Sequence, residues 1–445
     1  MMRFKRLDKW LLWLEQLHPV AIDLGLERVV QVAAQLPINT ASSQVVTVAG
    51  TNGKGSTLAA LQALLSYPHK SLTRPSIGVY SSPHLKHFTE RVQINGQPVT
   101  EIALCQALDR VDKARLDCGL SLSYFEFTTL AALLIFSEQD LDYMLLEVGL
   151  GGRLDAVNVI DADISVITPI DLDHQAWLGH TRDAIAIEKA GILRFGQSSV
   201  IADLDPPDSL IQQIKALQVK AVWPVVYSDD GHGFISAVDG SLSWQGKGDG
   251  GPNVLERLPI PQLAQPSWSA ALQVASLLKA LPSENICRQL LASLSLAGRL
   301  QRFSWANRVI LLDVAHNAQS VQRLADYLKN ESSLEEENSE GWTAIFAALE
   351  DKNIPLMLEV TASQIKKWYL PVLDNCPRSL PPNQIADYLT QLSAKSPIKS
   401  NIDTEIGLSV KESLINAINE GGEGDKIVVF GSFYTVGEAL VAIES

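Results

Sequence analysis

The sequence predicts an α/β protein with two domains, and three observations lead to this prediction. Its 445 residues exceed what one ordinary hydrophobic core organises. Apolar runs of strand length alternate with longer helical patterns, which is typical of a parallel sheet flanked by helices. Between residues 204 and 264, glycine, proline and short alternating segments interrupt this pattern and predict small antiparallel strands. We therefore expect domains at residues 1–293 and 294–445, with the antiparallel strands attached to the first.

The individual elements follow from the same alternation. In the first domain, the β-branched segment 44–49 predicts a strand that runs into Gly50, and segment 56–65 predicts a helix. Further strands are predicted at 77–81, 143–148, 163–168 and 199–202, with helices at 183–193 and 270–280. Strand and helix patterns repeat in the second domain at 309–313, 318–329, 343–348, 354–362, 367–370, 385–392, 410–419, 426–430 and 436–443. This second domain is expected to be a smaller, Rossmann-like α/β domain.

Composition narrows the class of protein. Hydrophobic residues make up 46% of the chain and charged residues 19%, which is typical of a well-packed globular protein. The formal net charge of −14 disfavours a nucleic-acid partner, because phosphate backbones attract basic surfaces. The four cysteines are scattered and form no C-x-x-C pair, so they predict neither a disulfide framework nor a zinc site. We expect a monomer in the cytoplasm.

The N-terminal segment MMRFKRLDKWLLWLEQLH places basic residues before apolar ones, as a signal peptide does. However, Asp8 and Glu15 interrupt its short apolar stretch, and an amphipathic helix with Trp10, Leu11, Leu14 and Leu17 on one side is the better interpretation. The longest apolar run, 130–136, is far shorter than the roughly 20 residues that span a bilayer. We therefore expect no association with membranes.

The segment VVTVAGTNGKGST has the context of a phosphate-binding loop, because a strand enters a glycine-rich turn and a helix follows. The glycines allow backbone N–H groups to turn toward an anion, and Lys54 is expected to reach the terminal phosphates. Ser56 or Thr57 offers a hydroxyl group to Mg²⁺. The spacing G-x-x-G-K is shorter than the common G-x-x-x-x-G-K-[ST]. Taken alone, the loop therefore predicts only that a phosphate group is held, and its short spacing argues against a generic ATPase.

Together with this loop, several other segments resemble the folylpolyglutamate synthase/dihydrofolate synthase family of the Mur ligase superfamily. They occur in the family's order along nearly the whole chain: IDLGLERV (22–29), YSSPHL (80–85), TERV (89–92), LEVGLGGRLDAVN (146–158), DHQAWLG (173–179), EKAGI (188–192), AGRLQ (297–301), DVAHN (313–317) and GSFYTV (431–436). The IDLGLERV segment is similar to that of members that also accept dihydropteroate. The resemblance implies a bacterial bifunctional enzyme of this family. It also implies that the first domain is P-loop ATPase-like and that ATP is bound by Thr51, Asn52, Gly53, Lys54, Gly55 and Ser56.

The resemblance implies that Ser82, Glu147 and His174 bind Mg²⁺. From the residues alone, Glu147 is placed well for this, because it ends a predicted strand at the ligand-binding edge of an open sheet. Ser82 and His174 alone would be interpreted as turn or core residues, and Ser81 stays a neighbouring candidate. Lys189 alone suggests a solvated helix face shared with Glu188; by resemblance it is carbamylated and helps to hold a second metal ion.

The resemblance also assigns residues to the substrates. Arg299 and Asp313 are expected to reach ATP, and His316 to lie near the acceptor side of the second domain. The pterin side is expected to comprise Asp23, Phe125, Asp155 and Asn158. Two positions depart from the family pattern: Ala318 replaces the proline of HNP, and Ser267 replaces an asparagine that contacts the nucleotide. Ser267 is therefore left out of the predicted site.

The resulting hypothesis is an ATP-dependent ligase that phosphorylates the carboxylate of dihydropteroate or of a folate glutamate and then joins it to L-glutamate. One alternative is folylpolyglutamate synthase activity alone. Another is a different Mur-type amino-acid ligase, such as a cell-wall peptide ligase. We disfavour it because the strand before the phosphate loop begins at Gln44, which leaves too few residues for the extra N-terminal domain that we expect in such a ligase. A third alternative is a non-catalytic nucleotide-binding protein, disfavoured because such a protein has no need for Glu147, His174 and Lys189 together.

Overall fold

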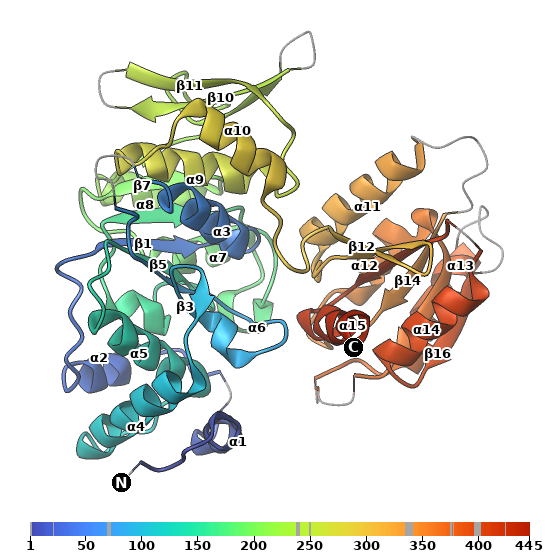
Figure 1. Ribbon diagram of the computed structural model, residues 1–445, viewed down its shortest axis with the longest axis horizontal. Helices are drawn as coiled ribbons and strands as arrows, with labels where there is room; N and C mark the ends of the chain where they lie inside the picture. Colours follow the sequence, from blue (N-terminus) through green and yellow to red (C-terminus); the bar gives the residue numbers. More distant parts are fainter. Residues whose placement is uncertain are drawn as a thin grey trace. The chain divides into compact units, whose positions relative to one another are not determined.

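The computed structural model describes residues 2–20, 22–68, 73–236, 241–248, 251–333, 341–373, 376, 378–395, 402–422 and 424–445. The chain forms two compact units (Figure 1). The first comprises Met1–His84 and Phe88–Leu294, and the second comprises Ser295–Ser445 together with the short segment Leu85–His87. Each unit contains a sheet of mainly parallel strands with helices packed on it, so the predicted α/β class is confirmed.

The main sheet of the first unit has eight strands, of which the six from β2 to β8 in the spatial order are parallel. The two strands at one edge, β3 and β4, pair antiparallel. Because the parallel strands share one direction, their carboxyl ends meet at one edge of the sheet, where such sheets bind ligands. In spatial order the strands are β4 (Gln97–Pro98), β3 (Val92–Ile94), β2 (Ile77–Tyr80), β5 (Tyr143–Glu147), β1 (Gln44–Ala49), β6 (Ile164–Ile167), β7 (Ser198–Ile201) and β8 (Lys220–Val222).

Helices cover this sheet and bury its apolar side chains. The N-terminal helix buries Leu7, Trp10 and Leu14, as its amphipathic pattern predicts, whereas Leu11 and Leu17 are only half-buried. The helices and 3₁₀ turns of the unit are α1 (Leu7–Leu17), α2 (Glu27–Ala33), α3 (Lys54–Leu65), η1 (Phe88–Arg91), α4 (Glu101–Asp117), α5 (Tyr124–Ser137), η2 (Ala156–Val159), α6 (Gln175–Leu178), α7 (Arg182–Ala190), α8 (Asp208–Ala216), α9 (Gln265–Leu277) and α10 (Glu284–Ser293). Helices α1, α2, α4 and α5 share one core cluster with β2 and β5.

A second, antiparallel sheet of three strands, β9 (Gly233–Ser236), β10 (Leu242–Gly248) and β11 (Gly251–Leu258), lies at the end of the first unit opposite α4 (Figure 1). The interval 204–264 also contains β8, a strand of the main sheet, and α8, which packs with that sheet, so the antiparallel strands begin only at Gly233. The buried His232 joins the small sheet to the rest, since its Nε2 donates to the carbonyl of Ile201 and its Nδ1 lies 2.7 Å from Ser269 Oγ.

The second unit is built on a six-stranded sheet with helices on both faces, as the Rossmann-like interpretation requires. Helices α11, α12 and α13 pack with one side of the sheet, and α14 and α15 pack with the other. In spatial order the strands are β12 (Gln301–Trp305), β13 (Arg308–Leu312), β17 (Lys426–Phe430), β14 (Trp342–Phe346), β15 (Ile365–Pro371) and β16 (Asp403–Gly407). The helices are α11 (Ala318–Ser333), α12 (Ile354–Thr361), η3 (Ala362–Gln364), α13 (Pro382–Lys395), α14 (Val410–Glu420) and α15 (Phe433–Glu444).

A search of the described residues finds no helix that is both long enough and apolar enough to cross a bilayer.

Candidate active site

The phosphate loop joins β1 to α3 through Gly50–Gly53, which confirms the predicted strand–turn–helix context. Gly53 precedes the helix with φ 92°, a left-handed conformation that favours glycine. A Cβ atom at Gly50 would lie 1.7 Å from Thr168 Oγ1, so no larger residue fits there. Helix α3 begins at Lys54, and the first N–H groups of an α-helix have no partner within the helix. Those of Lys54, Gly55 and Ser56 are therefore placed to bind an anion.

The two residues before Gly53 use their backbone N–H groups within the protein. The N–H groups of Thr51 and Asn52 both donate to the carbonyl of Pro169, at 2.9 and 3.3 Å. The Thr51 hydroxyl also lies 3.0 Å from the Asp171 carbonyl. These bonds fix the phosphate loop against the connection that follows β6. Thr51 and Asn52 thus use their backbone donors to shape the loop, and anion binding by them stays a prediction.

Lys54 lies over its own loop. Its Nζ donates to the carbonyls of Gly50 and Thr51, at 3.1 and 3.2 Å. Ser267, which was excluded from the predicted site, contacts the same loop, because its Oγ lies 3.3 Å from the Gly53 carbonyl. The amino terminus of α9 therefore supports the loop through Ser267.

Two of the three predicted metal ligands meet beside α3. Glu147 is buried at the end of β5, and its Oε2 would lie 3.6 Å from a Cβ atom at Gly55. The N–H of Ser82 donates to that same Oε2 at 3.1 Å, whereas the N–H of Ser81 pairs with the carbonyl of Arg91. A carboxylate and a serine hydroxyl group are oxygen ligands of the kind that Mg²⁺ prefers. The residues present therefore fit a divalent cation next to the phosphate loop.

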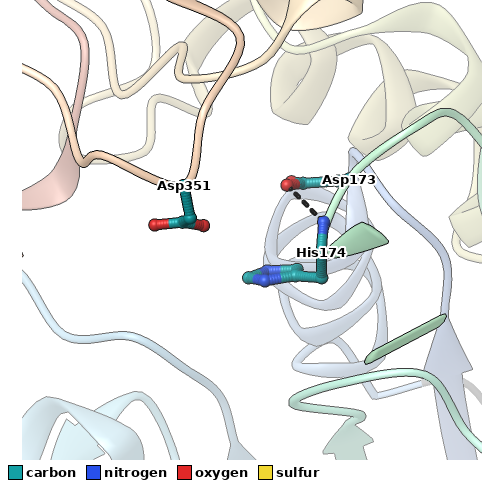
Figure 2. A group of neighbouring side chains, drawn as sticks. All are labelled: Asp173, His174 and Asp351. Carbon is teal, nitrogen blue, oxygen red and sulfur yellow. Dashed lines mark hydrogen bonds between the residues drawn. The ribbon is translucent and has the colours of Figure 1, made fainter. Parts of the chain in front are cut away.

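His174, the third predicted ligand, directly precedes α6 as its N-cap residue, with φ 50° (Figure 2). Its N–H donates to Asp173 Oδ1 at 2.8 Å. Asp173 is buried, and it was not among the site residues predicted from the sequence. The two aspartates of the segment DLDH were a signal that could have indicated it. Asp351, also drawn in Figure 2, belongs to the second unit.

Lys189 is buried in the last turn of α7, and its Nζ donates to the carbonyl of Gly50 at 2.9 Å. The simple interpretation of a solvated helix face is therefore wrong for this lysine. Its neighbour Glu188 is half-buried and pairs with the exposed Arg153 at 2.8 Å. Burial, assisted by the nearby charge of Lys54, lowers the pKa of Lys189 to about 7. A substantial fraction of this amine is neutral at physiological pH.

Two residues predicted for the pterin side stabilise the glycine-rich turn after β5. The buried Asp155 accepts hydrogen bonds from the N–H groups of Leu150 and Val157, and burial raises its pKa to about 6. Asn158 donates to the carbonyls of Arg153 and Gly191 and accepts from Arg194 at 2.9 Å. Both ends of the Asn158 amide are thus bound within the protein.

The other two pterin-side residues lie on separate elements. Phe125 is in the first turn of α5, and its ring packs over Gly149, where a Cβ atom would lie 2.4 Å from the ring. Asp23 precedes α2 and binds His18 Nε2 at 2.9 Å and Arg28 Nη1 at 2.6 Å. Contact of these residues with a substrate stays a prediction.

In the second unit, Arg299, Asp313 and His316 gather near the end of β13. Both oxygens of the buried Asp313 accept backbone N–H groups, from Leu300 at 2.8 Å and from Ala315 at 2.9 Å. The guanidinium group of Arg299 lies 5.2 Å from the centre of the Phe433 ring, and the His316 ring lies 5.8 Å from it. Burial raises the pKa of Asp313, and the positive charge of Arg299 opposes this.

Ala318 begins α11 without the proline that the family pattern has. The side chain of Asn317 accepts the N–H of Ser320 at 3.1 Å, and Ser320 Oγ accepts the N–H of His316 at 3.1 Å. These capping bonds fix the helix start and the position of the His316 backbone. Contact of Arg299 and Asp313 with ATP, and of His316 with an acceptor, stays a prediction.

Comparison with known proteins identifies the family of this chain. Residues 298–433 match the sequence model of the Mur ligase, glutamate ligase domain. Over 444 residues the chain is 37% identical to the dihydrofolate synthase/folylpolyglutamate synthase of Escherichia coli K12, with 99% of this chain and 96% of that protein covered. The chain belongs to the dihydrofolate synthase/folylpolyglutamate synthase family. The resemblance predicted from the motifs is confirmed.

Solved structures of the dihydrofolate synthase/folylpolyglutamate synthase family share the fold of this chain. The E. coli FolC structure in complex with DHPP and ADP has a TM-score of 0.84 and 34% identity, with 99% of this chain and 98% of that chain covered. A bifunctional folylpolyglutamate synthase/dihydrofolate synthase with Mn, AMPPNP and L-glutamate bound has a TM-score of 0.82 and 34% identity, with the same coverage. Both similarities extend over both units.

Proposed function

We propose that this protein is an ATP-dependent ligase that adds L-glutamate to 7,8-dihydropteroate and to tetrahydrofolate glutamates. The observation that carries the proposal is the group of charged side chains at the phosphate loop, in a chain of this family. Glu147 lies beside Gly55, and the buried Lys189 binds the carbonyl of Gly50. The names of the related structures support the choice of substrates, since those proteins bind DHPP, ADP and L-glutamate.

The reaction has two steps. An oxygen of the acceptor carboxylate attacks the γ-phosphorus of ATP, the bond from that phosphorus to ADP breaks, and an acyl phosphate forms. The amino group of L-glutamate then attacks the acyl carbon, phosphate leaves with the bonding electrons, and the amine loses a proton as the amide forms. The N–H groups at the start of α3 hold the phosphates, and Lys54 stabilises the charge on the transferred phosphoryl group. Exclusion of water protects the acyl phosphate from hydrolysis.

Ser82, Glu147 and His174 are the residues that would hold Mg²⁺. When bound, this ion neutralises charge on the phosphates. The amine of Lys189 is partly neutral, which is the form that reacts with CO₂. A carbamate formed there would add a carboxylate for a second ion. Lys189 donates to the same Gly50 carbonyl as Lys54, so this carboxylate would lie at the phosphate loop.

The remaining predicted residues are assigned to the other substrates. Asp23, Phe125, Asp155 and Asn158 form the pterin side, with Asn158 acting through the turn that it holds. Arg299 and Asp313 serve ATP binding, and His316 serves the acceptor side of the second domain. We place the enzyme in the cytoplasm as a monomer without a nucleic-acid or membrane partner.

The test of this function is the Lys54→Ala variant. Removing the amine should lower the rate of ADP release with dihydropteroate and glutamate by about 10²–10³-fold, since one preorganised donor contributes about that much. The matched control is Lys215→Ala, an exposed lysine on α8, which should keep the wild-type rate. A Lys54→Ala protein with a near-normal rate would exclude the proposed role of the loop.

Assays with two different acceptors show whether the enzyme has both the dihydrofolate synthase and the folylpolyglutamate synthase activity. We expect glutamate-dependent ADP release with dihydropteroate and also with tetrahydrofolate. Release with tetrahydrofolate alone would reduce the enzyme to a folylpolyglutamate synthase. Release with neither acceptor would indicate another amino-acid ligase of the Mur type.

A further inference from the structure

Arg28, at the start of α2, joins two acidic residues that are far apart in the sequence. Its Nε lies 2.8 and 2.9 Å from the two oxygens of Glu126, and its Nη1 lies 2.6 Å from Asp23 Oδ2. Its Nη2 donates to the main-chain carbonyl of Asp23. One planar guanidinium group therefore fixes the backbone and the side chain of Asp23 relative to Glu126.

Glu126 transmits this connection to the start of α5. Its side chain is buried and accepts the N–H of Ser123 at 2.7 Å, while Ser123 Oγ caps the N–H of Glu126, which completes a capping box. Phe125 directly precedes Glu126 within this capping box. The position of the Phe125 ring over Gly149 thus depends on the first turn of α5, which is the turn that Arg28 holds.

Asp23 itself is arranged to accept a ligand. His18 and Arg28 both bind Oδ2, and in the described part of the chain none of the hydrogen bonds uses Oδ1. The Asp23 side chain is 37% exposed, whereas that of Glu126 is 5% exposed. The hydrogen bond from His18, together with the charge of Arg28, lowers the pKa of Asp23. An ionised oxygen is therefore available beside the ion pairs.

We infer that Arg28 is a positioning residue that holds two walls of the pterin pocket, the Asp23 carboxylate and the Phe125 ring, at a fixed separation. The inference rests on the proposed function, which assigns Asp23 and Phe125 to the acceptor. A pterin presents adjacent N–H groups along one edge and a planar face. The edge suits the free oxygen of Asp23 and the face suits the Phe125 ring, so a defined separation lets one ligand satisfy both.

The choice of arginine follows from this geometry. Its rigid fork directs separate donors at the Glu126 carboxylate, the Asp23 carboxylate and the Asp23 carbonyl, whereas the ammonium group of lysine is a single compact charge. Arg28→Lys keeps the charge and removes the fork. This variant separates positioning from simple charge neutralisation.

The first experiment measures KM and kcat for Arg28→Lys and Arg28→Gln. We expect KM for dihydropteroate to rise by about tenfold or more in both variants, with KM for ATP within about twofold of wild type. The control is Arg110→Gln, which removes an exposed ion pair to Glu138 away from Asp23. An unchanged KM for dihydropteroate in Arg28→Lys would overturn the inference. An equal rise of both KM values would also overturn it, because that is the result of general structural damage.

The second experiment asks whether Arg28 acts through Asp23. Asp23→Asn should raise KM for dihydropteroate, and adding Arg28→Lys to it should raise KM by much less than the product of the single effects. Multiplicative effects would show that Arg28 acts elsewhere. An unchanged KM in Asp23→Asn would remove the assignment of Asp23 and the inference with it. A wild-type enzyme without any dihydropteroate activity would instead refute the proposed function, and the experiments distinguish these results.

Discussion

At the carboxyl edge of the first sheet, Glu147 lies beside the first turn of α3 and accepts the N–H of Ser82. Nearby, the buried amine of Lys189 on α7 donates to the Gly50 carbonyl of the phosphate loop. At the end of β13 in the second unit, the buried Asp313 instead accepts two backbone N–H groups, one for each oxygen. The first arrangement keeps charges in a setting that suits external ligands. The second uses its charge to shape a turn that presents Arg299. We therefore expect Glu147 to bind a ligand directly, and Asp313 to act on the ATP side through the turn that it shapes.

The sharpest test of this difference is Glu147→Gln, which keeps the shape and an oxygen acceptor for Ser82 but removes the charge. Activity should fall by about 10²–10³-fold, as expected when a metal ligand that supports phosphoryl transfer is lost. The melting temperature should stay near the wild-type value, because the side chain still offers an oxygen that accepts the N–H of Ser82. ADP release and calorimetry measure the two effects, with the exposed Glu101→Gln as control. Retained activity with lost stability would mean that Glu147 resembles Asp313.

Lys189→Met tests the buried amine near the phosphate loop, and the quantity measured is the free energy of unfolding. The pKa of Lys189 lies near 7 in the folded protein and near 10.5 in the unfolded chain, so the unfolded chain binds more protons between these values. The wild-type free energy of unfolding should therefore fall by about 4 kcal/mol as pH decreases from 10.5 to 7. In bicarbonate-free buffer Lys189→Met should lose this dependence and be the more stable protein at pH 7. Urea unfolding across this pH range measures it, and Lys215→Met should behave as wild type.

Asp313→Asn tests the second unit and should lower the stability, which Glu147→Gln leaves near the wild-type value. An asparagine offers one oxygen, so one of the two N–H groups from Leu300 and Ala315 loses its acceptor. The free energy of unfolding should fall by about 1–3 kcal/mol, the cost of a buried unsatisfied group. Denaturant unfolding measures this against Asp326→Asn, an exposed aspartate on α11. An unchanged stability would contradict the structural role assigned to Asp313.

The sequence was sufficient for features that depend on local pattern. The strands ending at Ala49 and Glu147 and the glycines of the phosphate loop follow from periodicity and backbone requirements, which neighbouring residues determine. The helix containing Lys189 was predicted for the same reason, whereas the burial of its amine was not. That burial depends on the Gly50 carbonyl, 139 residues away in the sequence. A charged residue on a helix gives no local sign of such a contact.

The same limit explains the residues that sequence reasoning missed. Arg28 meets Glu126 across 98 positions, and only the packing of α2 near α5 brings them together. The sequence also contained no sign that the amide of Asn158 is fully hydrogen-bonded within the protein. Its partners lie in the turn before it and at the end of α7. A resemblance of motifs indicates which residues recur at a site. It does not distinguish those that face a ligand from those that hold the backbone around it.

A single carbonyl group, that of Pro169, accepts the N–H groups of both Thr51 and Asn52. The phosphate loop and the connection that leads to Asp173 and His174 are therefore joined through this carbonyl group. A substitution in the β6–α6 connection that displaces Pro169 would remove the acceptor of two N–H groups in the loop. We therefore expect such a substitution to disturb the phosphate loop, although no residue of the loop itself is changed.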